Sequence, residues 1–231
     1  MLDSKKLLGI LFAVILIYSG NAFANGNGND KPFFKDIENS RRNPGPKLFS
    51  FDLDVQVGIG IASSNFNLNK VDSNSQSLNN TGTKVGPSVG ATVSLNLLGY
   101  GFSTGILYTP KGFQTSSGTN FNLHYFVVPW LIYFNLDFNR VRIDGNFGPY
   151  VGILLNNDAY MSNNVNLFVP KNIDVGLSAN VEGTYFFTKI LGALLGVKYE
   201  YGGLNNLAST EYISSLHTST FFVYTGLKIA I

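Results

Sequence analysis

The chain contains no cysteine and little charge. Without cysteine it has no disulfide bonds, no thiolate metal ligands, no cysteine nucleophile and no lipid anchor on an N-terminal cysteine. Only 13% of its 231 residues are charged, whereas 45% are hydrophobic and 14% are aromatic, which is little charge for one domain in water. The formal net charge of +2 gives no strongly basic surface, so we expect no nucleic-acid partner.

The apolar run near the N-terminus is short. It extends from Leu7 to Tyr18, which is less than the about 20 residues of a membrane-spanning helix. Lys5 and Lys6 precede it, and Ala22-Phe23-Ala24 offers small residues at the two positions that a signal peptidase reads. We predict that residues 1–24 are a signal peptide cleaved after Ala24. The alternative is an uncleaved N-terminal anchor.

Residues 25–49 combine glycine, asparagine, proline and mixed charges without a sustained hydrophobic period. Such a segment buries too little apolar surface to fold alone. We therefore predict a disordered periplasmic linker. Phe33 and Phe34 are candidates for contact with a protein partner, although adjacent aromatics in a polar linker also occur by chance.

From residue 50 to the C-terminus, apolar side chains alternate with polar or small ones, as in Phe51 to Ile61 (FDLDVQVGIGI). This period of two is typical of β-strands with one apolar face. The sequence predicts eight strands, the last of which ends with residues 223–231. The predicted segments are 51–61, 85–97, 100–108, 121–136, 140–153, 173–182, 191–202 and 223–231.

The fourth predicted strand is the exception, because residues 124–134 (HYFVVPWLIYF) are apolar in both phases. Periodicity alone cannot orient this strand. Pro129 lacks a backbone N–H, so we expect a bulge or a locally unpaired site around it.

The connections and the composition of the polar face decide between two architectures. Long polar connections alternate with short ones, with long connections expected after residues 61, 108, 153 and 202. The polar face is rich in glycine, serine and asparagine rather than lysine and glutamate, which suits the narrow inside of a closed barrel better than a surface in water. We predict that residues 50–231 form an all-β, eight-stranded antiparallel up-and-down transmembrane β-barrel, with its apolar face toward lipid. The alternative is a soluble sandwich or lipocalin-like barrel with the apolar face inside.

Aromatic residues gather near both ends of the predicted strands, as expected for girdles at two membrane interfaces. The alternative is that they are core residues. The girdle expected near the short turns consists of Tyr100, Phe102, Phe138, Tyr185 and Phe187, and the girdle expected near the long loops consists of Tyr108, Phe113, Phe121, Tyr125, Tyr199 and Tyr201.

Four short motifs carry a resemblance to a known family. They are LYTPKGF at 107–113, Val128-Pro129, GPYVG at 148–152 and YEYGGL at 199–204. With these motifs, residues 50–231 resemble the PorT-like outer-membrane β-barrel domain family. The resemblance implies a place in the Gram-negative outer membrane, and one branch of that family is tied to a protein secretion system. Family members often carry an inward acid and base around the strand-four proline, where this chain has Val127 and Tyr133.

Charged side chains of both signs share the inward phase, so they are available to pair. Unpaired charges in a confined interior would be costly. We predict a structural network of ion pairs that plugs the lumen, and the alternative is a narrow ion or proton path. Asp52 and Asp54 share this phase, and the predicted network consists of Arg140, Arg142, Asp144, Asp174, Glu182, Lys198, Glu200 and Lys228.

Chemical motifs are scarce. Gly58 and Gly60 are not followed by the third glycine and the helix of a dinucleotide loop. His124 and His217, with Glu211 or Ser215, could build a hydrolase only if the fold brought them together. We predict no catalytic, cofactor or metal site and no enzymatic activity.

We therefore expect a non-enzymatic protein of the bacterial outer membrane that displays polar extracellular loops for binding or envelope organisation. Its partners would be outer-membrane lipid and a periplasmic or cell-surface protein. The alternatives are an accessory subunit of a protein secretion system and a narrow ion channel.

Overall fold

The computed structural model describes residues 50–68, 81–97, 100–115, 120–138, 140–159, 171–205, 207 and 213–231. The predicted signal peptide, its cleavage site after Ala24 and the predicted linker 25–49 lie outside these residues. Within the described ranges, no helix is long and apolar enough to cross a membrane.

Within these ranges, eight strands of 12 to 19 residues and one strand of 2 residues form a single sheet. Each of the eight predicted segments matches one of the long strands, apart from residue 140 just before β6 and residue 231 just after β9. The strands are β1 (Ser50–Leu68), β2 (Thr81–Gly82), β3 (Lys84–Leu97), β4 (Tyr100–Thr115), β5 (Asn120–Phe138), β6 (Val141–Ala159), β7 (Ile173–Phe186), β8 (Leu191–Gly202) and β9 (Ile213–Ala230).

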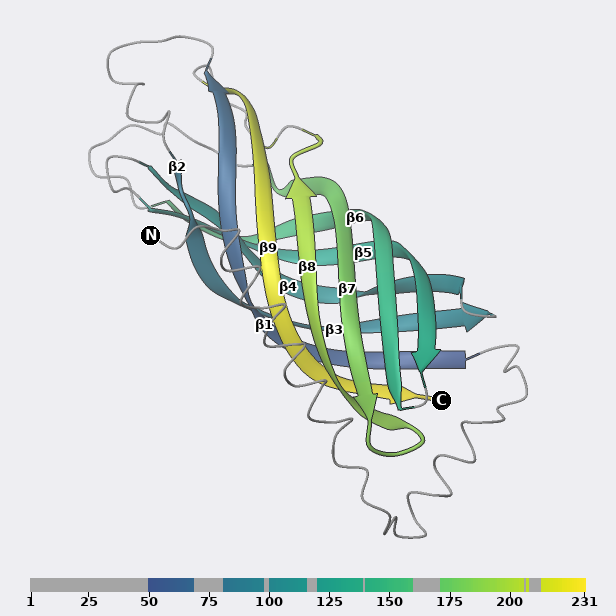
Figure 1. Cartoon of the computed structure of the whole chain (residues 1–231). Helices are drawn as coiled ribbons and strands as arrows, with labels where there is room; N and C mark the ends of the chain where they lie inside the picture. Colours follow the sequence, from purple (N-terminus) through teal and green to yellow (C-terminus); the bar gives the residue numbers. More distant parts are fainter. Residues whose placement is uncertain are drawn as a thin grey trace. The chain divides into compact units, whose positions relative to one another are not determined.

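The sheet closes on itself. Its strand order is β2-β4-β3-β1-β9-β8-β7-β6-β5, and β5 pairs with β4 to complete the circle. The strand pairs of the described residues are all antiparallel, and β1 lies beside the C-terminal β9, as Figure 1 shows. The described residues therefore form the predicted closed, eight-stranded antiparallel barrel, which leaves no complete edge strand.

Several strands continue past the ends predicted for them. β1 remains paired with β9 as far as Leu68 and Ile213, although the apolar alternation ends at Ile61. The long connection expected after residue 108 is wrong, because β4 pairs with β5 up to Gln114 and Asn120. Backbone pairing does not require apolar side chains, so these polar segments extend the sheet without the pattern that reveals a strand.

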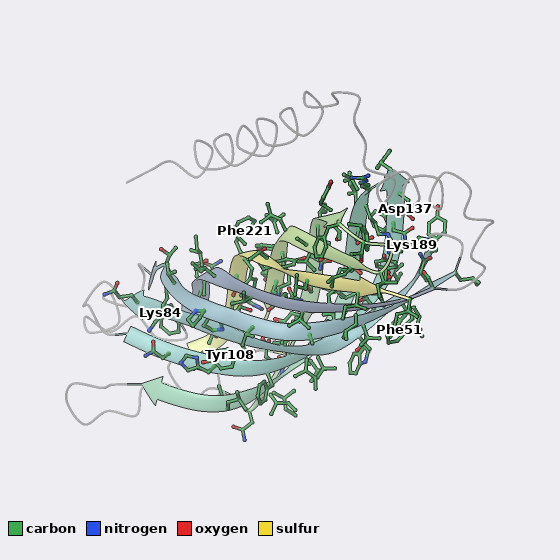
Figure 2. All side chains as sticks on the ribbon, turned by 90° about the horizontal axis from the view of Figure 1, so that it is seen from below. Phe51, Lys84, Tyr108, Asp137, Lys189 and Phe221 are labelled. Atoms are coloured by element: carbon green, nitrogen blue, oxygen red, sulfur yellow. The ribbon has the colours of Figure 1, made fainter. Side chains whose placement is uncertain are left out.

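The two faces of the wall have the predicted orientation. Val55, Val57 and Ile59 are 52%, 54% and 58% exposed, whereas Asp52 and Asp54 on the same strand are 0% and 4% exposed. Apolar side chains therefore point outward and charged ones inward. In Figure 2, the labelled Phe51 marks the end with the short turns, and Tyr108 lies toward the other end.

Glycines on one strand make room for large side chains from another. A Cβ atom on Gly176 would lie 2.5 Å from the Tyr150 ring, and one on Gly196 would lie 2.4 Å from the Tyr224 ring. Tyr150 and Tyr224 are themselves buried inside the barrel. The interior is thus filled by pairing large residues with small ones across neighbouring strands.

Pro129 lies at a locally unpaired site, as predicted. The β4–β5 ladder contains the pairs Thr104↔Trp130 and Leu107↔Val127 but not the two positions between them. The Thr104 hydroxyl instead donates a hydrogen bond of 2.8 Å to the Pro129 carbonyl. The side chain therefore replaces part of the ladder that proline interrupts.

The predicted girdle near the short turns faces outward, since all five of its aromatic residues are exposed. The girdle predicted near the long loops is wrong in two members, because Phe113 and Tyr125 are 1% and 0% exposed and lie inside. Both were placed there by closeness to a loop, but they occupy inward positions of β4 and β5. Tyr199 is exposed, Tyr108 and Tyr201 are half-buried, and the side chain of Phe121 is not among those described.

Candidate functional site in the barrel lumen

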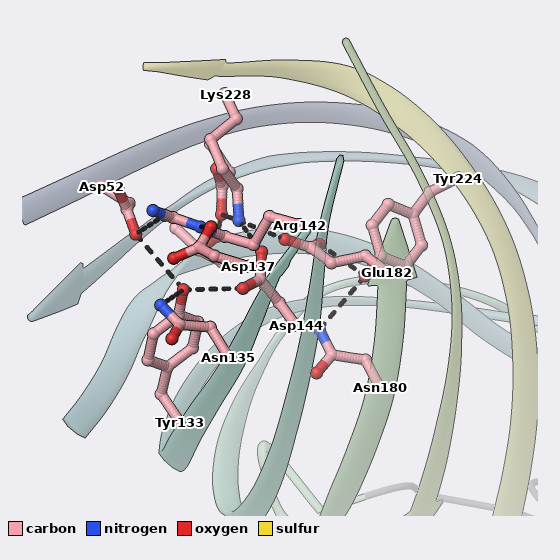
Figure 3. A network of polar contacts seen from close by, with 12 residues as sticks. Asp52, Tyr133, Asn135, Asp137, Arg142, Asp144, Asn180, Glu182, Tyr224 and Lys228 are labelled. Atoms are coloured by element: carbon pink, nitrogen blue, oxygen red, sulfur yellow. Dashed lines mark hydrogen bonds and ion pairs between the residues drawn. The ribbon is translucent and has the colours of Figure 1, made fainter. Parts of the chain in front are cut away.

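A cluster of charged side chains fills the lumen near the short turns (Figure 3). Lys228 from β9 is its centre: its Nζ lies 2.6 Å from Glu182 Oε1 and 3.5 Å from Asp54 Oδ2, and it also pairs with Asp144. Arg142 lies beside it, with its Nη1 2.9 Å from Asp52 Oδ2. We call Asp52, Asp54, Arg142, Asp144, Glu182 and Lys228 the lower cluster.

Tyrosine hydroxyls complete the hydrogen bonding of the lower cluster. Tyr133 donates to Asp144 Oδ1 at 2.8 Å, and Tyr224 donates to Glu182 Oε2 at 2.9 Å. The Arg142 Nε donates to the partly exposed Asp137 at 2.8 Å. These contacts tie together side chains from β1, β5, β6, β7 and β9, so the cluster cross-links the inside of the barrel.

A second group of charges lies farther along the lumen. Lys111 Nζ lies 2.8 Å from Asp174 Oδ2 and 3.3 Å from Glu200 Oε2, and Lys198 Nζ lies 3.0 Å from Glu200 Oε1. Tyr150 accepts a hydrogen bond of 2.5 Å from Lys111 and donates one of 3.0 Å to Asp174. We call Lys111, Tyr150, Asp174, Lys198 and Glu200 the upper cluster.

Aromatic rings cover the cations of both clusters. Lys111 Nζ lies 4.0 Å from the centre of the Tyr150 ring, and Lys198 Nζ lies 4.3 Å from that of Phe222. The Arg142 guanidinium lies 5.3 Å from the centre of the Phe186 ring. A ring face attracts a cation that has been removed from water, so these contacts help to hold the charges inside.

The clusters differ in charge balance. The lower cluster has four carboxylates for the two cations Arg142 and Lys228, whereas the upper cluster has Asp174 and Glu200 for Lys111 and Lys198. Each side chain of the pairs is at most 10% exposed, apart from Asp137. Removal of one partner would therefore leave a buried, uncompensated charge.

Seven of the eight residues predicted for the lumen network lie in these two clusters. The eighth, Arg140, is half-buried in the turn before β6. The prediction missed Lys111, which is 1% exposed, because its segment was assigned to a loop. Leu107 faces inward, and residues 109 and 111 lie on the same face of an extended strand. Continuing the strand by four residues would therefore have identified Lys111.

Around the upper cluster, the inside of the barrel also holds apolar side chains. Leu107, Leu123, Val127 and Leu216 belong to a buried hydrophobic cluster that also contains Phe113, Tyr125, Tyr150 and Leu207. Leu207 comes from the connection between β8 and β9, and its N–H donates to the Leu216 carbonyl at 3.3 Å. The polar, glycine-rich inner face predicted for the whole barrel is therefore wrong at this end, where the inward half of the doubly apolar β5 lies.

The histidines lie apart, on β5 and β9. Each stacks on a tyrosine: the ring centres of Tyr108 and His124 are 5.6 Å apart, and those of Tyr201 and His217 are 5.8 Å apart. Tyr108 and His124 also share a hydrogen bond of 2.7 Å. Ser215 is half-buried on β9, and Glu211 lies outside the described residues. Among the described residues, no group of acidic or histidine side chains could hold a metal ion.

A match to a family model agrees with this architecture. A family model described as "Outer membrane protein beta-barrel domain" matches residues 38–209. A search of curated proteins gave no match. Similar solved structures include neisserial surface protein A, at 14% identity over 78% of this chain and 96% of that one, with a TM-score of 0.47. AlkL is 12% identical over 90% and 96% (TM-score 0.49), and Ail of Yersinia pestis is 12% identical over 78% and 99% (TM-score 0.41).

Proposed function

Because the chain belongs to the outer membrane protein β-barrel domain family, we propose that it is a non-enzymatic barrel whose lumen is plugged and whose loop end binds a partner. The partner would be a cell-surface or envelope protein. The barrel itself serves as a rigid support for this binding surface in the bacterial outer membrane.

The observation that carries this proposal is that all four cations of the two clusters are held in ion pairs within the lumen. Lys228 is surrounded by three carboxylates, and Lys111 by two, with tyrosine hydroxyls between them. Removing one partner of a buried pair is costly, so groups engaged in such pairs stay with one another rather than with a passing solute. This favours a structural plug over a narrow ion channel, and it leaves the loop end as the surface for binding.

The length of the strands supports a role for that end. A strand that crosses a bilayer needs about 9–11 residues, whereas β1, β5 and β6 each have 19. Outward-facing side chains on β1 change from Ile59 and Ile61 to Ser63 and Asn65, so the extra length lies on the side of the long connections. In barrels of this class the long connections face the outside of the cell, where they would be held away from the membrane surface.

We also propose the finer assignments made from the sequence. Residues 1–24 are the signal peptide, residues 25–49 are the periplasmic linker and residues 50–231 are the barrel of a PorT-like protein. The family match over residues 38–209 supports the last assignment in its coarser form. If the linker also engages a periplasmic protein, the chain would be an accessory subunit of a secretion system, as the PorT-like resemblance implies.

A cross-linking experiment in native envelopes tests the binding role. Proteins captured by the complete chain are compared with those captured by a variant with a shortened 160–170 connection and by one with linker residues 25–49 replaced by a glycine-serine segment. We expect the first variant to lose the partner and the second to retain it. Loss in the linker variant alone would contradict loop binding and favour the secretion role. Retention in both variants would contradict a partner site at either place.

A further inference from the structure

Three of the four carboxylates of the lower cluster have a close charged donor. Asp52 Oδ2 lies 2.9 Å from Arg142 Nη1. Lys228 Nζ lies 2.6 Å from Glu182 Oε1 and also pairs with Asp144. Tyrosine hydroxyls give Asp144 and Glu182 a second donor, at 2.8 and 2.9 Å. Each of these three carboxylates is therefore bonded as a buried negative charge requires.

Asp54 is the exception. Its Oδ2 lies 3.5 Å from Lys228 Nζ and 3.5 Å from the Thr92 hydroxyl, which is the outer limit of a hydrogen bond. Its Oδ1 has no hydrogen-bond partner among the described residues, although the side chain is only 5% exposed. Asp52 Oδ1 also lacks a partner, but the other oxygen of Asp52 is bonded to Arg142. Asp54 is thus the one carboxyl group of the lower cluster that is buried without a close donor.

The barrel wall determines the neighbours of Asp54. In the register of the sheet, Asp54 lies opposite Thr92 of β3 and opposite Lys228 of β9. Both neighbours point inward, since Thr92 is 8% exposed and Lys228 is 0% exposed. Lys228 already has two carboxylates closer to its Nζ, so Asp54 is the third carboxyl group beside a single ammonium group.

The other charges around Asp54 oppose a second negative charge there. Asp52 on β1, Asp144 on β6 and Glu182 on β7 all face it as carboxylates. Thr92 is the polar neighbour on β3, and the charged side chains of β4 and β8 belong to the upper cluster. The titratable groups in and around the lower cluster are, strand by strand, Asp52 and Asp54 on β1, Tyr133 and Asp137 on β5, Arg142 and Asp144 on β6, Glu182 on β7, and Tyr224 and Lys228 on β9.

We propose that Asp54 holds a proton at neutral pH, which makes the lower cluster a proton-binding site inside the barrel. The proton is bound to one oxygen of the Asp54 carboxyl group, and the other oxygen still accepts from Thr92 and Lys228. The cluster then consists of three carboxylates with close donors and one uncharged acid where the donors are distant. The site does not depend on the partner proposed for the loop end.

The bound proton links the stability of the barrel to pH. Above about pH 5 the same carboxyl group is ionised in the unfolded chain, so the folded chain binds one more proton than the unfolded chain. Raising the pH therefore disfavours folding, and one proton changes the folding equilibrium constant by about tenfold per pH unit. At a pH high enough to remove the proton, Asp54 would be a buried charge beside three other carboxylates.

Infrared spectroscopy of the unchanged chain tests the site directly, because the carbonyl stretch of a protonated carboxyl group is separate from the carboxylate bands. The measurement is made at pH 7 in a detergent that contains no carbonyl group. We expect a protonated-carboxyl band in the unchanged chain and its loss in Asp54→Asn. Absence of the band from the unchanged chain would overturn the proposal. A band that persists in Asp54→Asn would also overturn it, because the proton would then belong to another group.

Urea unfolding in lipid vesicles provides a comparison with a matched control. Asp54→Asn replaces an uncharged acid by an uncharged amide, so at pH 7 we expect the folding equilibrium constant to change little. Asp52→Asn makes the same change two residues away, but it removes a charged partner of Arg142, so we expect a decrease of at least about tenfold. An equal decrease in both variants, or failure of Asp54→Asn to fold where Asp52→Asn folds, would overturn the proposal.

The pH dependence of unfolding separates this site from the proposed role of the loop end. Between about pH 5 and 7, we expect the folding equilibrium constant of the unchanged chain to fall by about tenfold more per pH unit than that of Asp54→Asn. The same pH dependence in the two chains would overturn the proton site, whatever protein is captured at the loops. Loss of the loop partner would equally leave this difference in place.

Discussion

At the scale of single residues, the stability of this barrel depends on which buried charge has a second partner. Glu200 pairs with both Lys111 and Lys198, at 3.3 and 3.0 Å, so it would retain one cation if the other were removed. Asp54, Asp144 and Glu182 instead share Lys228. Lys198 and Lys228 therefore differ in their importance for stability, although both are buried in ion pairs.

We predict that Lys228→Met destabilises the barrel by at least about 3–5 kcal/mol, the cost of leaving a buried charge without its partner. Lys198→Met makes the same change of side chain and should cost clearly less stability, because Glu200 would still be paired with Lys111. Urea unfolding in lipid vesicles, followed by tryptophan fluorescence, measures both. Equal losses in the two variants would contradict the central role of Lys228.

At the scale of an element, the outward-facing side chains of a strand change from apolar to polar along its length, and this change marks the edge of the membrane-facing band. On β1, Val57 is 54% exposed within the apolar band, whereas Ser63 lies on the same face and is polar. The six residue steps from Val57 to Ser63 correspond to about 20 Å along a strand, which is enough to move a side chain from hydrocarbon to the interface.

We predict that Val57→Arg costs about 2–4 kcal/mol, whereas Ser63→Arg on the same face costs at most about 1 kcal/mol. The reason is the depth dependence of placing a charge in hydrocarbon. Unfolding in vesicles again provides the measurement, and the same variants in detergent micelles serve as a control for local packing. If the Ser63 variant were the more costly one, our placement of the band would be wrong.

At the scale of the whole molecule, closure and the plug determine how the protein behaves in a membrane. The complete strand circle leaves no edge to open in detergent, and the lower and upper clusters lie inside the lumen, where we propose that they plug it. Both features can be measured on the purified full-length chain.

We predict that the protein fractionates with the outer membrane and migrates differently on a denaturing gel before and after boiling. A closed barrel resists detergent until heat breaks its ladder. Recovery of the chain in the soluble periplasm, or identical migration under both conditions, would contradict a membrane barrel.

We also predict no steady, porin-like conductance in a planar bilayer. Arg142→Ala removes the guanidinium that lies 2.9 Å from Asp52, so it should permit at most a small, flickering current while lowering the stability. Lys189→Ala, in the exposed turn after β7, is the control and should change neither property. A large and stable current through the unchanged chain would contradict the plug and favour the channel.

The sequence alone determined the strands and which face of each is apolar, because a period of two with apolar residues on one phase is a local property of each strand. It also identified most of the lumen charges, since Arg142, Asp144 and Lys228 follow directly from that phase. Pro129 marked an interrupted ladder for the same kind of reason: the missing N–H belongs to the residue itself.

Only the tertiary structure decided which residues meet. Lys111 lies 63 positions before Asp174 in the sequence, and no local pattern shows that the barrel wall brings them within 2.8 Å. The inward side of β5 could not be read where both phases are apolar, so Tyr125 and the apolar end of the lumen became visible only when pairing with β4 and β6 fixed its orientation.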